Sequence, residues 1–345
     1  MDTSANFNAN QAISFAEAHP AGKAVHAGGI RALSTGNIKA GAALRGLGLL
    51  EWRTGKLTRI PNPPGKELTA PSWSYDGKRF VASMGGRGAV THNQIVVVDL
   101  PSFAVTEMTG HQYVKGDKEY TRTRTSPVFQ PETGNILYVE QEWAAMPGRL
   151  HLFNPKDGTD QAIQSKQEGF WNALFRPSFI GLEEVIFQAI GPDDRNVKEK
   201  IRELSGSGAS DVAYYLRFGE KDEILFPDLQ KRKSLYDPGL SGVTATPDGK
   251  IIIASRFSSA EPRNKRDQYN YEIFRIDGGT PRQLTNLRTF LVVPDIAYDG
   301  SVVAFGNDPG RTRRIDLSIL DMKTGAITHT GLLGRIEQSL DFVLR

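Results

Sequence analysis

The stretch "TATPDGKIIIAS", Thr244 to Ser255, decides the fold, because it reads as a strand, a tight turn and a second strand. Asp-Gly suits such a turn, since glycine accepts a positive φ and aspartate tolerates one. Similar stretches occur twice more, as "SWSYDGKRFVAS" from Ser72 and "DIAYDGSVVAFGN" from Asp295. The chain therefore repeats one β-hairpin unit.

Two weaker copies of the turn complete a set of five, "VFQPETG" from Val128 and "LFRPSFIG" from Leu174. After each turn come an apolar strand and a third strand rich in β-branched and aromatic residues. A polar turn and a short fourth strand follow, as in "GGTPRQLT" from Gly278. Four strands repeated at roughly 45 to 70 residues indicate propeller blades. Such a unit cannot bury both of its faces alone, so its neighbours must supply the partner surfaces.

The two ends of the chain suggest how the ring closes. "GIRALST" (Gly29), "GLGLLEWR" (Gly46) and "KLTRIP" (Lys56) read as second, third and fourth strands that lack a first one. The last segment, "EQSLDFVLR", reads as a strand with nothing after it. We therefore predict an all-β, six-bladed propeller of four-stranded antiparallel blades. In this prediction Ser339 to Leu344 completes the N-terminal blade beside Ile30 to Ser34.

The predicted domain organisation is an N-terminal extension, residues 1–25, followed by one propeller, residues 26–345. We expect a short helix over Asn10 to His19, outside the ring. The first residues lack the basic and apolar regions of a signal peptide. No run of 18 or more apolar residues exists, which predicts no transmembrane segment.

Composition excludes several classes of function. The 345 residues are 39% hydrophobic and 23% charged, which is ordinary for a globular protein, and 35 glycines and 19 prolines indicate many turns. The absence of cysteine excludes disulfides, thiol nucleophiles and cysteine metal sites. A net charge of +3, without any recognisable nucleic-acid-binding module, predicts no nucleic-acid partner.

The units "TPDGKIIIAS" and "GGTPRQLT" resemble the repeats of the TolB-like, or PD40 (WD40-like), six-bladed propellers. That pattern is an SPDGK turn, an apolar strand and a final GG-PRQLT strand, and "SYDGKRFVAS" and "AYDGS" match it as well. The resemblance covers about residues 24–345. It implies a fold more than a function, since such propellers serve as protein-binding scaffolds, sensors, peptidase gates and enzymes. It also implies a periplasmic or secreted location for a mature form; cytoplasmic is the other reading.

Long loops are expected on the face where second strands lead to third strands and fourth strands lead to the next blade. Such loops often carry function on a rigid scaffold. One of them has apolar residues at i, i+4 and i+7 (Val197, Ile201 and Leu204), which predicts a short helix that covers the propeller mouth, docks a partner or only packs on its neighbours. The three loops are Gly110–Thr125, Gly191–Asp211 and Ser255–Asn270.

This loop face is rich in arginine, with tryptophan nearby. Arginine grips carboxylate or phosphate through two hydrogen bonds, so the face could hold an anionic sugar, a peptide C-terminus or an acidic protein surface. The other reading is that these charged loops are simply solvated. The predicted ligand-binding residues are Arg87, Arg122, Arg124, Trp143, Arg149, Trp171, Arg256 and Arg288.

No metal motif is evident, because none of the six histidines stands in an HxH or HExxH pair. A propeller can still gather ligands from several blades, and the weak metal candidates are the loop residues His92, His111 and Glu142. His151 and His329 fall in predicted strands, where we expect structural roles. No cofactor is evident, and a divalent metal is the one option left open.

Other catalytic motifs are missing as well. The chain has no GxSxG elbow and no phosphate-binding loop. Asp295 and Asp341 fall in predicted first strands, which line the axial channel, and there they could bind a cation or act as acid and base. Alternatively, they pair with channel arginines such as Arg124 or Arg288.

The function predicted first is a non-enzymatic binding scaffold that recognises an acidic protein or another anionic ligand through the basic loop face. The alternative is a propeller enzyme, a lyase or hydrolase acting on an anionic saccharide with a divalent metal. The sequence leaves the choice between scaffold and enzyme open.

Overall fold

The structure is a computed structural model of the whole chain, and it describes most of the propeller. The described residues are 12–16, 47–51, 56–86, 94–108, 112–115, 118–121, 123–141, 148–163, 171–172, 175–189, 191–192, 212–230, 239–260, 269–289, 294–307, 314–335 and 343–344. Among them there is no helix long and apolar enough to cross a membrane.

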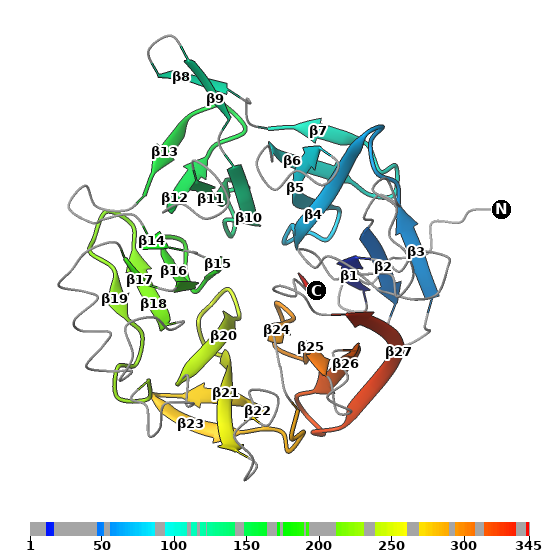
Figure 1. The fold of residues 1–345 in the computed structure, drawn as a ribbon, viewed down its shortest axis with the longest axis vertical. Helices are drawn as coiled ribbons and strands as arrows, with labels where there is room; N and C mark the ends of the chain where they lie inside the picture. Colours follow the sequence, from blue (N-terminus) through cyan, green and yellow to red (C-terminus); the bar gives the residue numbers. More distant parts are fainter. Residues whose placement is uncertain are drawn as a thin grey trace.

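The fold is a β-propeller in which antiparallel sheets stand around a central axis (Figure 1). Five blades are built from consecutive strands, and each is named here by its first, innermost strand. The β4 blade contains β4 (Lys66–Trp73), β5 (Arg79–Gly86), β6 (Gln94–Asp99) and β7 (Val105–Glu107). The β10 blade contains β10 (Thr123–Phe129), β11 (Ile136–Gln141), β12 (Gly148–Phe153) and β13 (Asp160–Ala162).

The other three blades have the same order of strands. The β15 blade contains β15 (Phe175–Phe179), β16 (Glu184–Ala189), β18 (Val212–Arg217) and β19 (Glu223–Ile224). The β20 blade contains β20 (Leu240–Ala245), β21 (Ile252–Ala260), β22 (Tyr269–Asp277) and β23 (Thr280–Gln283). The β24 blade contains β24 (Pro294–Ile296), β25 (Val302–Asn307), β26 (Arg314–Asp321) and β27 (Ile327–Arg335).

The predicted count of six such blades is corrected to five. The remaining strands form a terminal sheet, ordered β28-β1-β2-β3, that combines both ends of the chain. Its short β28 pairs with β1 through Ile13 with Leu344 and Ser14 with Val343. The predicted partner, residues 30–34, lies outside the described residues. The strands are β1 (Ala12–Ala16), β2 (Leu47–Glu51), β3 (Lys56–Ile60) and β28 (Val343–Leu344).

Strand β1 lies where the sequence analysis expected a helix over residues 10–19. In its sequence "AISFA", Ile13 and Phe15 alternate with small residues, a period of two that favours a strand over a helix. The boundary near residue 25 between extension and propeller stays a prediction.

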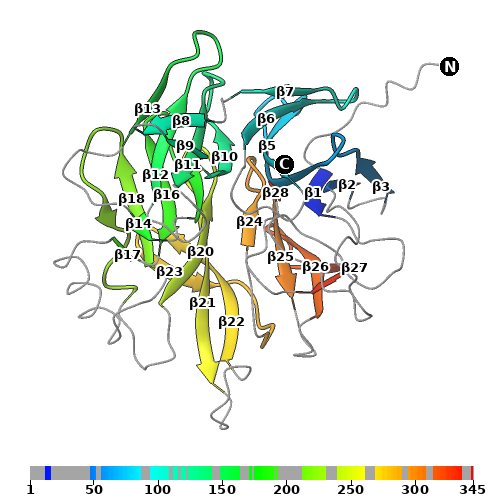
Figure 2. The same ribbon diagram turned by 45° about the horizontal axis from the view of Figure 1, so that its top comes forward.

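Two of the predicted loops contain regular structure instead. The loop at 110–125 contains a separate hairpin, β8 (Gln112–Lys115) with β9 (Lys118–Thr121), which projects beyond the ring in Figure 1 and overlaps the β10 blade in the turned view of Figure 2. The loop at 255–270 is shortened because β21 and β22 continue into it, pairing Ala260 with Tyr269. The predicted helix over 197–204 lies outside the described residues. Near it, β14 (Trp171–Asn172) joins β12 to β17 (Gly191–Pro192).

The repeated turn is held by its own side chains, as the Asp-Gly pattern predicts. In the β4 blade, Asp76 Oδ1 accepts the Lys78 backbone N–H at 3.0 Å and the Ser74 hydroxyl at 2.6 Å. In the β20 blade, Asp248 makes the same two contacts with Lys250 and Thr246, at 3.1 and 2.7 Å. The Lys250 ammonium and the Thr246 hydroxyl lower the pKa of Asp248 to about 2.

Apolar packing between neighbouring sheets forms the core. Each described cluster spans two adjacent sheets: Val81 and Ile95 of the β4 blade meet Ile136 of the β10 blade, for example. Further clusters join the β10 and β15, the β15 and β20, and the β20 and β24 blades. Leu47 of the terminal sheet packs in the same way with Trp73 of the β4 blade. The terminal sheet therefore occupies a neighbour's position beside the β4 blade.

The turn glycine of the β20 blade provides a test of how tightly neighbouring blades meet. Gly249 has φ +67°, and a Cβ there would lie 3.0 Å from the Ile180 carbonyl oxygen in the turn of the preceding β15 blade. Gly134, with φ +77°, has nothing within 4 Å of such a Cβ. We expect Gly134→Ala to cost about 1 kcal/mol for the left-handed backbone, and Gly249→Ala about 2 kcal/mol or more. Urea unfolding measures both, and equal costs would contradict a tight contact between the turns.

Candidate functional site

The innermost strands of four blades contain a β-bulge at an equivalent place, where their pairing with the second strand shifts in register. Pairing with the second strand shifts between Thr69 and Ser72 in β4, and likewise between Thr125 and Val128 in β10. The same shift occurs in β15 and β20. A residue of positive φ lies in three of these bulges: Ala70 (47°), Ser126 (51°) and Gly242 (56°). Bulges re-aim backbone and side chains, and strained backbone of this kind gathers at functional sites.

These interruptions open onto a mouth at the axis, on the face that carries the repeated turns. The mouth is an open hollow with an empty volume of about 730 Å³, part of which is open solvent. All five blades contribute to it. The lining residues from the inner strands are Ala70, Pro71, Ser72, Ser126, Pro127, Val128, Pro177, Ser178, Phe179, Val243, Thr244, Ala245, Pro294, Asp295 and Ile296, and those from the turns are Tyr75, Pro247 and Tyr298.

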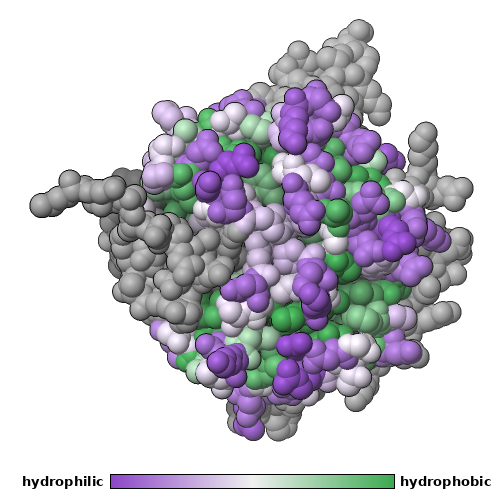
Figure 3. Space-filling model, turned by 180° about the vertical axis from the view of Figure 1, so that it is seen from behind, coloured by the Kyte–Doolittle hydropathy of each residue, from purple (hydrophilic) through white to green (hydrophobic). Residues whose placement is uncertain are grey.

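The lining is mostly prolines, hydroxyl groups and small apolar side chains. Among these residues Asp295 is the one with a carboxylate, and its Oδ1 accepts a hydrogen bond from the Thr244 hydroxyl at 3.0 Å. In Figure 3 the centre of the face is pale, the colour of intermediate hydropathy, and strongly hydrophilic residues surround it. Prolines, hydroxyl groups and small apolar side chains have such intermediate hydropathy. The mouth is thus suited to hydrogen bonding and apolar contact more than to binding a strong charge.

Two tyrosines of the repeated turns meet at one side of the mouth. The rings of Tyr75 and Tyr298 stack with their centroids 4.5 Å apart and their planes at 17°. The Tyr298 hydroxyl donates to the Trp73 carbonyl oxygen at 2.8 Å. These contacts link the first and the last of the five blades and give the mouth an aromatic wall.

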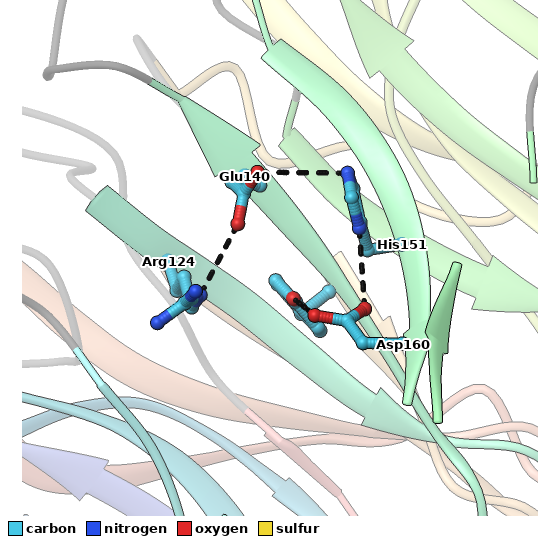
Figure 4. Close-up of polar contacts among 5 residues, drawn as sticks. Arg124, Glu140, His151 and Asp160 are labelled. Atoms are coloured by element: carbon cyan, nitrogen blue, oxygen red, sulfur yellow. Dashed lines mark hydrogen bonds and ion pairs between the residues drawn. The ribbon is translucent and has the colours of Figure 1, made fainter. Parts of the chain in front are cut away.

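A second polar arrangement lies within the β10 blade (Figure 4). Arg124 Nε contacts Glu140 Oε2 at 3.3 Å, and Glu140 Oε1 lies 3.6 Å from His151 Nε2. His151 Nδ1 lies 3.2 Å from Asp160 Oδ1, while the Tyr138 hydroxyl donates to Asp160 Oδ2 at 2.6 Å. One polar chain thus crosses all four strands of the blade, and we call these five residues the blade network.

Strand register explains why these side chains meet. Arg124 is paired with Glu140, and Tyr138 with His151, so all four lie on the same face of the sheet. Tyr138 also belongs to the apolar cluster between the β4 and β10 blades, so the network borders that interface. Glu140 therefore has two arginines as register partners, Arg124 in β10 and Arg149 in β12.

Burial sets the protonation states at one end of the network. Burial, and then the hydrogen bond to Asp160, raise the pKa of Tyr138, so its hydroxyl keeps its proton and donates. Burial alone would raise the pKa of Asp160, but hydrogen bonds from His151 and Tyr138 outweigh it and lower that pKa. Asp160 is therefore ionised at neutral pH, so both of its oxygens can accept hydrogen bonds.

The structure describes the side chains of four predicted ligand-binding residues, Arg124, Arg149, Arg256 and Arg288. Arg124, in β10, contacts Glu140 of β11, and its predicted pairing with a channel aspartate stays a prediction. Arg149 is half-buried in β12. Arg256, in β21, lies over the Phe274 ring at 5.9 Å. Arg288 is exposed with φ +47°, after β23.

The remaining predicted residues fall where the structure gives no side chain. Trp171 forms part of β14, and only its backbone is described. Arg87, Arg122 and Trp143 lie outside the described residues, as do the metal candidates His92, His111 and Glu142 and the channel candidate Asp341. Their roles stay predictions.

Sequence reasoning placed Asp295 at the axis, where it lines the mouth, but it missed the other lining residues and the blade network. A signal for the mouth was present: a proline precedes the end of four inner strands, as Pro71, Pro127, Pro177 and Pro294. Proline interrupts a ladder because it has no N–H to donate, so its recurrence inside predicted strands marks a bulge. The network had no such signal, since its members are far apart in sequence.

Comparisons with known proteins agree with this fold and go no further. No family model matches the chain, and no curated protein matches it. Solved structures do match: TolB from Acinetobacter baumannii superposes with a TM-score of 0.60 at 14% identity, covering 97% of this chain and 66% of TolB. The chain thus spans about two thirds of that protein. It is a β-propeller, and its fold is similar to that of TolB and related propellers.

Two other solved structures are similar at comparable levels. A protein described as a TolB from Agrobacterium tumefaciens has a TM-score of 0.53 at 14% identity, covering 85% of this chain and 94% of its own. An oligogalacturonate lyase in complex with manganese has a TM-score of 0.52 at 15% identity, covering 86% and 72%. At such identities the likeness concerns the fold alone.

The lowered pKa of Asp160 makes the stability of the blade network depend on pH. The ordinary pKa of an aspartate is 3.8, and the pKa of Asp160 in the folded protein is lower. The resulting stabilisation is therefore complete above pH 3.8 and is lost as pH falls through the lowered pKa. We expect Asp160→Asn to destabilise the protein near pH 6 and the difference from wild type to shrink toward pH 2. Urea unfolding at several pH values measures this. The exposed Glu223→Gln serves as control, and a pH-independent difference for Asp160→Asn would contradict the assignment.

Proposed function

We propose that the protein is a non-enzymatic binding scaffold that takes an extended segment of a protein partner into its axial mouth. The observation that carries this proposal is the lining of the mouth. Prolines, hydroxyls and apolar groups from all five blades surround it, with the stacked Tyr75 and Tyr298 on one side. Peptide backbone needs hydrogen-bond partners and its side chains need apolar surface, and this lining supplies both.

Acid–base chemistry is poorly supported at the same place. General acid–base catalysis requires titratable groups of suitable pKa within reach of the substrate, and glycoside hydrolysis in most families requires two carboxylates. Among the lining residues Asp295 has the one carboxylate, and Thr244 donates to it. A binding role therefore fits the described mouth better than a hydrolytic one.

The family resemblance is compatible with a scaffold. The fold likeness to TolB concerns two thirds of that protein's length, so its partners and activity come to this chain only as proposals. A periplasmic or secreted location, which the resemblance implies, belongs to the same proposal.

The second candidate is recognition of an acidic or anionic ligand on the opposite, loop-bearing face, either by a scaffold or by a lyase or hydrolase with a divalent metal. Exposed Arg288 favours it, because Glu272 accepts the backbone N–H groups of Leu287 and Arg288 at 2.7 and 2.8 Å and so fixes that loop. The likeness to an oligogalacturonate lyase with manganese favours the enzymatic version.

We further propose that the terminal sheet closes the ring. Strand β28 contacts β24 and β25 on one side and β4 on the other, so it stands between the last and the first of the five blades. Closure by both ends of the chain avoids an exposed sheet edge and an exposed apolar face.

A variant that fills the mouth tests the scaffold proposal. Random linear peptides are displayed and selected against the purified chain, and enriched peptides are measured by fluorescence anisotropy. We expect binding near 1 μM, and Ser178→Trp, inside the mouth, should weaken it more than about tenfold because the new ring occupies the volume. Leu182→Trp is the matched control, since Leu182 is 45% exposed and does not line the mouth.

The same preparation addresses the alternative. Incubation with oligogalacturonate, with and without manganese, is followed by detection of an unsaturated product. Cleavage by wild type that persists in Ser178→Trp, together with no peptide binding, would support the enzyme and overturn the mouth scaffold.

Proline in β28 tests closure. Leu344→Pro removes a backbone donor from the strand that pairs with β1, and we expect it to lower the free energy of unfolding by about 3 kcal/mol or less. Scanning calorimetry compares it with deletion of Arg345 alone. An unchanged Tm in Leu344→Pro would show that the terminal pairing does not hold the ring together.

A further inference from the structure

We propose that the axial mouth selects a basic segment of its partner and binds one lysine or arginine side chain beside Asp295. Such selectivity rests on the proposed function, since it gives the charge of the segment that the scaffold takes. The distribution of charge inside the mouth and around its rim supports it.

The interior of the mouth has one sign of charge. Asp295 is the one carboxylate among the lining residues, and none of those residues is lysine, arginine or histidine. Asp295 is half-buried among prolines and small apolar side chains. Walls of low polarity concentrate the field of a charge in a cleft, so a carboxylate there attracts a cation more strongly than a fully exposed one does.

The carboxylate of Asp295 is oriented by a neighbouring blade. The Thr244 hydroxyl is buried and donates to Asp295 Oδ1 at 3.0 Å. Thr244 belongs to β20 and Asp295 to β24, so two blades hold this group in place. A carboxylate has about four acceptor sites on its two oxygens, so an ammonium or guanidinium group can bind beside the Thr244 hydroxyl.

Other parts of the lining suit the rest of such a side chain. Tyr298 follows Asp295 in the same blade and stacks on Tyr75, and aromatic rings attract cations through their faces. Prolines such as Pro177 and Pro294 offer apolar surface to the methylene groups of lysine or arginine. A lysine or arginine side chain therefore matches the lining better than an aspartate or glutamate does.

The rim of the mouth is acidic as well. The turn between first and second strands carries an exposed carboxylate in each of the five blades, against two exposed lysines, Lys78 and Lys250. Arg79 and Glu184, which begin β5 and β16, have opposite charges and leave this balance unchanged. The field of this face therefore favours the approach of a basic segment. The rim carboxylates are those of Asp76, Glu132, Glu183, Asp248 and Asp299.

Parallel selections test the preference for basic segments. Random linear peptides are displayed and selected against wild type and Asp295→Asn, and the frequency of Lys and Arg at each position is compared with the unselected library. We expect at least about threefold enrichment of Lys or Arg at one position with wild type, and none with Asp295→Asn. Asp157→Asn is the matched control, because Asp157 is an exposed aspartate between β12 and β13 that does not line the mouth. Circular dichroism confirms that each variant is folded.

A charge swap separates recognition from a structural role of Asp295. The best basic peptide is acetylated at its N-terminus, so that a side chain supplies the positive charge, and is compared by fluorescence anisotropy with its counterpart that has Glu in place of the selected Lys or Arg. Wild type should bind the Glu peptide about tenfold more weakly, and Asp295→Lys should reverse that order. A purely structural role would weaken both peptides equally and would contradict the proposal.

Failure of this selectivity is distinguishable from failure of the proposed function. Peptides that Ser178→Trp blocks, but that show no preference for Lys or Arg or keep it in Asp295→Asn, overturn the selectivity and leave the scaffold standing. Selection of no peptide by wild type overturns the scaffold and the selectivity together. Basic peptides that bind Ser178→Trp as tightly as wild type are attracted by the rim alone, which overturns binding beside Asp295.

Discussion

Packing between the faces of neighbouring sheets is the constraint on which the rest of this structure depends. A four-stranded sheet has two faces, and here both are apolar along the inner and middle strands: in β11, Leu137 and Val139 face one cluster while Ile136 and Tyr138 face another. No blade can bury both surfaces by itself. Radial stacking buries these faces between neighbouring blades, which is why the repeated hairpins stand around a common axis.

That arrangement dictates where a ligand site can form. Blades converge on the axis, so their innermost strands come close together without pairing with one another. The bulges at Ala70 and Ser126, each followed by a proline, turn backbone and hydroxyl groups toward that space. Apolar clusters pack the β4, β10, β15 and β20 blades on both sides, so the inner strands that line the mouth are held in place by their neighbours.

The sequence predicted the repeated part of the fold better than its ends or its sites. The Asp-Gly turns and the apolar strands after them have local signals, and the contacts of Asp76 and Asp248 confirm them. Strand β1 was mistaken for a helix because five residues carry little periodicity, and its partner β28 comes from the opposite end of the chain. The arginines were grouped by loop position, but Arg124 lies in a strand and binds Glu140, a contact set by register.

The blade network shows how one blade can carry chemistry apart from the axis. Its residues tie the four strands of the β10 blade to one another, whereas the mouth uses only the inner edges of the blades. The network does not enter the mouth, since neither Glu140 nor His151 lines it. Strand β10 belongs to both, because it contributes Arg124 to the network and Ser126 to the mouth. The bulge between Thr125 and Val128 therefore lies directly between the network residue Arg124 and the residues that line the mouth.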